Sequence, residues 1–110
     1  MLPFSRVTIV GLGLIGSSLA HAIRAYLPTV RVTGHDASPE VREIARRIDL
    51  CDDITDTAGA SVIDADLVIL CVPPGAMKAG AAAIRDDLPK EAVLSEVASC
   101  QASVIAAIRE

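Results

Sequence analysis

A glycine-rich segment near the amino terminus carries the clearest chemical signal in the sequence. Gly11, Gly13 and Gly16 form a G-x-G-x-x-G pattern that follows a β-branched run and opens a helical stretch. In this setting the first glycine allows a tight turn, the second lets a pyrophosphate approach the backbone, and the third lets the helix pack closely on the strand. Free N–H groups of the first helical turn, which includes Leu14 and Ile15, can then hold phosphates. The segment therefore predicts a dinucleotide site rather than a plain connecting turn.

An acidic residue follows at the distance expected for binding the adenosine ribose. Asp36 comes about 20 residues after the glycine segment, at the end of the second expected strand. A carboxylate at this place accepts hydrogen bonds from the ribose hydroxyls and repels a 2′-phosphate. Ala37 follows, so no arginine adjoins the acid, and Arg42 and Arg46 are expected on the solvated face of the next helix. We therefore predict that the cofactor is NAD rather than NADP.

A second stretch is expected to reach the same cofactor. Val72 and Pro73 end the apolar run 67–73 and lie at the carboxyl edge of a strand, where open α/β sheets hold their ligands. We expect their backbone to contact the cofactor, although a rigid strand-to-helix turn would also explain the prolines. His21 and His35 are not expected to act as catalytic bases, because they lie in the wrong elements.

The elements that must position these residues alternate along the chain. We expect strands at residues 7–10, 30–33, 53–55, 67–72 and 92–97, and helices at 15–26, 39–48, 76–84 and 102–108. Nearly continuous apolar strands that alternate with helices are typical of a parallel sheet covered on both faces. The sequence predicts one Rossmann-type domain over residues 1–110, a doubly wound parallel sheet of order 3-2-1-4-5 in three α/β/α layers.

Apolar spacing predicts which faces of the first two helices are buried. The first helix is expected to pack through Ile15, Leu19, Ala22, Ile23 and Tyr26. The second begins with Ser38 as the N-cap and Pro39 at the first helical position, both common helix-start signals. Its expected buried face consists of Val41, Ile44, Ala45 and Ile48.

Composition excludes several other classes of protein. The 110 residues carry a formal charge of −4, contain only two aromatic residues and show no basic run, which argues against nucleic acid and membrane as partners. The three cysteines, Cys51, Cys71 and Cys100, include no C-x-x-C pair, so we expect neither disulfides nor a metal site. Reduced thiols and the absence of a signal-peptide pattern predict a cytoplasmic protein.

Four stretches, in this order and spacing, resemble the amino-terminal domain of the prephenate and arogenate dehydrogenases. They are residues 7–20, 34–36, 65–73 and 95–99. The resemblance implies an NAD-dependent enzyme of tyrosine biosynthesis that oxidises and decarboxylates prephenate or arogenate, with hydride passing to the nicotinamide. It also implies a homodimeric full-length enzyme, whose substrate-binding and dimer-forming domain and catalytic His-Pro motif are expected to lie beyond residue 110.

The resemblance also assigns roles to individual residues. The three glycines would cradle NAD, Asp36 would bind its ribose, and Ser99 would match the family serine that reaches the substrate and the nicotinamide. The alternative for Ser99 is a simple N-cap of the helix at 102–108. The segment departs from the family pattern, because Ala98 replaces a glycine, Cys100 a valine and Gln101 a lysine. The missing lysine puts a charge contact from that position in doubt.

Two other functions remain open from the sequence. One is the cofactor domain of a different NAD(P)-dependent dehydrogenase or imine reductase. The other is a non-catalytic module that senses NAD(H) and transmits a conformational change, which would leave the likeness around Ser99 unexplained.

Overall fold

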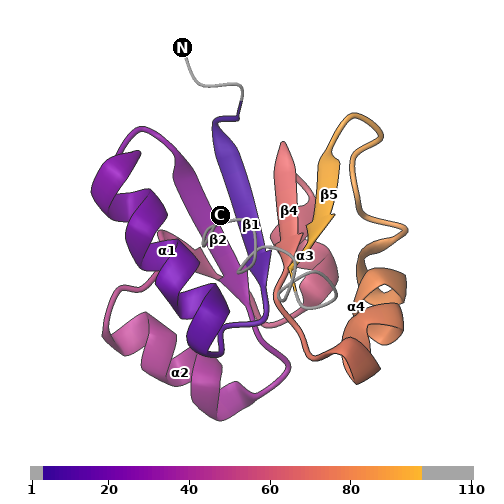
Figure 1. Cartoon of the computed structure of the whole chain (residues 1–110), viewed down its shortest axis with the longest axis horizontal. Helices are drawn as coiled ribbons and strands as arrows, with labels where there is room; N and C mark the ends of the chain where they lie inside the picture. The colour runs from indigo at the N-terminus through magenta and orange to yellow at the C-terminus, as the bar shows by residue number, and fades with distance from the viewer. Residues whose placement is uncertain (1–3, 98–110) are drawn as a thin grey trace, which may run out of the picture.

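A parallel sheet of five strands forms the middle layer of the domain (Figure 1). In the computed structural model, which describes residues 4–97, the strand order is β3-β2-β1-β4-β5. The strands are β1 Arg6–Val10, β2 Arg31–His35, β3 Asp53–Ile54, β4 Leu67–Leu70 and β5 Val93–Glu96. Every neighbouring pair is parallel. The predicted fold class and strand order are therefore confirmed.

Helices cover both faces of this sheet. They are α1 Leu14–Tyr26, α2 Pro39–Arg47, α3 Ala58–Val62, the 3-10 turn η1 Pro74–Ala76 and α4 Met77–Ile84. One core cluster joins β1 and β2 to α1 and α2 through Ala20 and Ala45. A second cluster joins β4 to α3 and α4 through Val62 and Ile84. The result is the three-layer arrangement expected for strands that are buried on both faces.

Helix α1 packs most closely through its smallest residues, while Leu19 and Ile23 also pack against the core as predicted. Gly16 and Ala20 are buried, with Ile23 partly buried beside them, whereas Ala22 and Tyr26 are exposed. The prediction that Ala22 and Tyr26 belong to the buried face is therefore wrong. Small side chains let the helix axis approach the sheet, so the contacting face is centred on Gly16 and Ala20.

Helix α2 begins as the sequence predicts but buries less than expected. The Val41 N–H donates to Ser38 Oγ at 3.3 Å, and Pro39 is the first helical residue. Ala45 is buried, but Ile44 and Ile48 are more than half exposed, so their predicted place in the core is wrong. Strand β3, which neighbours α2, has only two residues, so there is little sheet surface for Ile44 and Ile48 to cover.

Strand β2 extends further than the sequence suggested, and this extension shapes the functional edge. It continues through Gly34 and His35, which pair with Ile9 and Val10 of β1. Asp36 therefore leaves the sheet at the same level as Gly11. No helix in the described residues is long and apolar enough to cross a membrane. The predicted helix at 102–108 lies outside the described residues.

Candidate functional site

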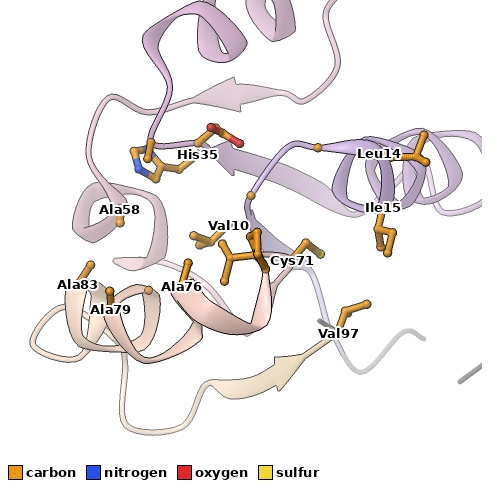
Figure 2. A pocket seen from close by; sticks show the side chains of 17 residues that line it. Val10, Leu14, Ile15, His35, Ala58, Cys71, Ala76, Ala79, Ala83 and Val97 are labelled. Atoms are coloured by element: carbon orange, nitrogen blue, oxygen red, sulfur yellow. The ribbon is translucent and has the colours of Figure 1, made fainter. Parts of the chain in front are cut away.

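A cavity of about 710 Å³ opens at the carboxyl edge of β1, β2 and β4 (Figure 2). Its volume lies within the range usual for small-molecule and cofactor sites. The predicted site residues that line it are Gly11, Gly13, Leu14, Ile15, Asp36, Val72 and Pro73. Gly16 is buried beneath the glycine loop and does not line the cavity, and Ser99 lies outside the described residues. The predicted residues that line the cavity therefore come from three separate segments, which meet at one edge of the sheet.

Gly11 fits tightly between the two strands that flank β1. Its φ of +102° is a backbone conformation that side chains other than glycine rarely adopt. Its N–H donates to the His35 carbonyl at 2.7 Å, and a Cβ on Gly11 would lie 2.5 Å from the Cys71 carbonyl oxygen. Only glycine allows the chain to turn out of β1 at this point.

Gly13 and Gly16 differ in what surrounds them. A Cβ on Gly16 would collide with the carbonyl oxygen of Gly11, so this glycine allows α1 to pack against the loop. A Cβ on Gly13 would have no atom of the described residues within 4 Å. Because Gly13 also lines the cavity, its bare backbone is available to a ligand.

No side chain in residues 4–97 caps the first turn of α1. Gly13 is the N-cap residue, makes no side-chain hydrogen bond, and no acidic residue lies in the first turn. The hydroxyl of Ser17 turns away to donate to the Leu12 carbonyl at 2.9 Å. The N–H groups at a helix start lack partners within the helix and carry the positive end of its dipole. With Leu14 and Ile15 on the cavity wall, this turn can hold an anionic group such as a pyrophosphate.

The Asp36 carboxylate joins the glycine loop to the start of α2. Its Oδ2 accepts the Leu12 N–H at 2.8 Å, and its Oδ1 accepts the Ser38 N–H at 2.9 Å. A carboxylate offers about four lone-pair positions, so each oxygen can accept one more hydrogen bond. Asp36 and Ala37 both line the cavity, where those free positions suit the vicinal hydroxyls of a ribose.

Arg42 does not lie on a solvated face, so that prediction is wrong. Its side chain is only 15% exposed and folds back over the turn between β2 and α2. Its Nη1 donates to the Asp36 carbonyl at 2.8 Å and to the Ala37 carbonyl at 3.3 Å. Helical spacing cannot reveal this contact, because the carbonyls that attract the guanidinium lie outside the helix.

The other end of the cavity has a wall of small side chains. These are Ala76, Ala79, Gly80 and Ala83 of η1 and α4, with Ala58 of α3 beside them. Figure 2 shows Ala58, Ala79 and Ala83 on the opposite side from Leu14 and Ile15, with Val10 and Cys71 between. The alanine-rich sequence predicts only close packing on the sheet, so it does not indicate that these residues line the cavity.

His35 lies beside that wall and is almost fully buried. Its Nδ1 lies 2.9 Å from the Thr55 carbonyl oxygen, which can only accept, so Nδ1 carries the proton. In the neutral ring Nε2 is then an acceptor. This bond ties the end of β2 to the segment after β3, which gives His35 a structural role.

Cys71 lies on the floor of the cavity but is not an activated nucleophile. Burial raises the pKa of its thiol to about 11, so the thiol stays protonated at neutral pH. Burial likewise raises the pKa of Cys51 to about 11. Both cysteines are free thiols, and packing accounts for their positions.

Comparison with known proteins adds a family to this geometry. The family model for the nucleotide-binding domain of prephenate dehydrogenase matches residues 19–110. A cyclohexadienyl dehydrogenase of Zymomonas mobilis is 44% identical over 110 residues, which are 100% of this chain and 38% of that protein. The chain therefore spans less than two fifths of this curated relative. The family match begins after the glycine loop, so the geometry of that loop is separate evidence for a nucleotide site.

Solved structures agree with the sequence comparisons. Prephenate dehydrogenase from A. aeolicus, in complex with hydroxyphenyl propionate and NAD⁺, superposes with a TM-score of 0.77 at 28% identity, covering 86% of this chain and 34% of that one. Arogenate dehydrogenase from Synechocystis gives a TM-score of 0.77 at 26% identity, covering 86% of this chain and 33% of that one. The chain belongs to the prephenate dehydrogenase family, in which it corresponds to the nucleotide-binding domain.

Proposed function

We propose that this chain is the NAD-binding domain of a dehydrogenase that oxidises and decarboxylates prephenate or arogenate. The observation that carries the proposal is the meeting of the uncapped start of α1 with Asp36 at one edge of the cavity. The residues present fit a dinucleotide, because open space faces Gly13 where a pyrophosphate would approach the backbone. Bound NAD would supply the hydride acceptor for a ring carbon that bears a hydroxyl group.

Each part of the cavity has a task in this proposal. The N–H groups of the first turn of α1 hold the pyrophosphate, and Asp36 accepts the adenosine ribose hydroxyls. The wall of small side chains on α4 receives the adenine, while the backbone of Val72 and Pro73 supports the middle of the cofactor. Val97 lines the cavity two residues before Ser99, which supports a place for Ser99 near the substrate and the nicotinamide.

The remaining parts of the enzyme belong to the same proposal. The substrate pocket, a catalytic histidine and a dimer interface are assigned to a second domain outside these 110 residues. The net charge of −4 and the lack of a basic run support a small-molecule enzyme without a nucleic-acid partner. The two free thiols in the described residues support a reducing, cytoplasmic setting.

The choice of cofactor gives a direct test. We expect the chain to bind NAD at least tenfold more tightly than NADP in calorimetric titrations, because the 2′-phosphate would face the Asp36 carboxylate. Asp36→Ala removes hydrogen bonds to a charged acceptor, so NAD affinity should fall by about 1.5–3 kcal/mol, roughly 10- to 150-fold. The same change removes the repulsion, so the gap between the two cofactors should narrow. Equal or tighter binding of NADP by the unaltered chain would contradict the assignment.

Turnover gives a second test. We expect the 110-residue chain to bind NAD without producing NADH from prephenate or arogenate, since the described residues offer no base placed for proton transfer. A protein that also contains the second domain should form NADH with one of the two substrates, as followed by absorbance. NADH formation by the 110-residue chain alone, dependent on either substrate, would show that the catalytic group lies within these residues.

A further inference from the structure

Three charged side chains form a cluster beside the ribose end of the cavity. Arg42 and Arg46 come from α2, and Asp56 comes from the segment between β3 and α3. Asp56 Oδ1 lies 2.6 Å from Arg46 Nη2 and 3.4 Å from Arg42 Nε. One carboxylate oxygen therefore faces both arginines.

We propose that Asp56 is a specificity-determining residue, which disfavours dinucleotides with a 2′-phosphate by neutralising Arg42 and restraining Arg46. This inference depends on the proposed function, because it concerns how the same site distinguishes NAD from NADP. From the sequence, the preference for NAD is attributed to Asp36 alone. Asp56 is a second residue that contributes to this preference.

The position of Arg42 makes its charge relevant to the ribose. Its Nη1 is held by the carbonyls of Asp36 and Ala37, the two residues that border the ribose end of the cavity. A 2′-phosphate on a ribose bound at Asp36 would therefore lie near this guanidinium. Arginine is well suited to phosphate, because its planar fork donates two hydrogen bonds at once. In this chain the Nε side of that fork faces Asp56 instead.

Arg46 is the arginine that is free to move once Asp56 is neutral. Its side chain is 47% exposed, and its polar contacts within the described residues are Asp56 and the Ile54 carbonyl, the latter at 3.3 Å. The hydrogen bond from Arg46, followed by its charge, holds the pKa of Asp56 below the ordinary range, so the carboxylate is ionised near neutral pH. The cluster with Asp36 then contains two positive and two negative groups. Removal of the Asp56 charge leaves an excess positive charge next to the ribose.

The test compares two isosteric changes with the same effect on net charge. Asp56→Asn removes the carboxylate that faces the two arginines. Asp53→Asn removes the carboxylate that pairs with Arg31, away from the cavity lining. Asp56 is 72% exposed and Asp53 is 51% exposed, so both variants should fold, which thermal unfolding can verify. The readout is the ratio of the dissociation constants for NADP and NAD, measured by calorimetry.

In Asp56→Asn this ratio should fall about five- to tenfold, corresponding to about 1–1.4 kcal/mol in favour of NADP. In Asp53→Asn it should change by less than about twofold. The double variant Asp56→Asn/Arg46→Gln should lose a large part of this gain in relative affinity for NADP, because it lacks the mobile guanidinium of Arg46.

The outcomes separate this inference from the proposed function. If the unaltered chain binds no NAD, the proposed function fails and this inference fails with it. If NAD binds but Asp56→Asn changes the ratio no more than Asp53→Asn, only the inference is overturned. A gain of unchanged size in the double variant would also contradict the proposal, because the restraint of Arg46 that it requires would then contribute nothing.

Discussion

Replacement of Gly16 with alanine is expected to lower the free energy of unfolding by about 3 kcal/mol. The new Cβ would collide with the carbonyl oxygen of Gly11 and press on Ile9, a fully buried core residue. The atom in the way belongs to the backbone of a loop whose φ and hydrogen bonds are already fixed, so it cannot move aside easily. A loss of this size is a large part of the 5–15 kcal/mol typical of a domain. Urea denaturation followed by circular dichroism would measure it.

Gly80 supplies the matched control for this change. It also lies within a helix, α4, but a Cβ there would make only ordinary contacts, at 3.6 Å to Val72 and 4.0 Å to Leu70. Gly80→Ala should therefore leave stability unchanged or raise it by up to about 1 kcal/mol, from the higher helix propensity of alanine. Equal losses in the two variants, or none in Gly16→Ala, would show that the close approach of α1 to the glycine loop does not limit stability.

Gly13→Val is expected to weaken NAD binding strongly while changing stability little, in contrast to Gly16→Ala. A side chain at this position would have no described atom within 4 Å of its Cβ, and the backbone has a negative φ of −73°. Valine is a poorer N-cap residue than glycine, so the free energy of unfolding should fall by about 1 kcal/mol at most. The side chain would occupy the place where we propose that the pyrophosphate approaches the start of α1. Calorimetry should show NAD affinity reduced about a hundredfold, or ~2.7 kcal/mol.

The control for Gly13 is Gly75, which also has no atom within 4 Å of an added Cβ. Gly75 lies in η1 and does not line the cavity, so Gly75→Val should keep NAD affinity within about twofold. A Gly13→Val protein that binds NAD as tightly as the Gly75→Val protein would place the pyrophosphate elsewhere and would contradict the proposed binding mode.

The sequence predicts the fold well because the decisive signals are local. The glycine spacing, the β-branched run before it and the Ser38-Pro39 helix start each depend on residues that are near one another in the chain. Together they predict β1, the loop and the start of α2. The strand order follows once right-handed crossovers are assumed for alternating strands and helices.

The features that the sequence did not predict depend on contacts between distant segments. Helix α3 has only five residues, too few for a periodic pattern, and is recognisable mainly by the cap that Thr57 provides. Helical spacing places Arg42 on the surface, because the Asp36 and Ala37 carbonyls that hold its guanidinium are not part of its helix. The contribution of Asp56 requires β3 to place it against α2, which no local spacing reveals.

The double anchoring of Asp36 restricts how cofactor preference can change during evolution or engineering. The same carboxylate that we expect to bind the ribose also accepts one N–H from the glycine loop and one from the start of α2. A lineage that moves toward NADP must remove this negative charge without losing the acceptors that hold two loops together. Asparagine and serine keep an acceptor oxygen without the charge, whereas alanine and glycine lose both. Variants at this position should therefore be viable in the order of their acceptor capacity, rather than in the order of their size.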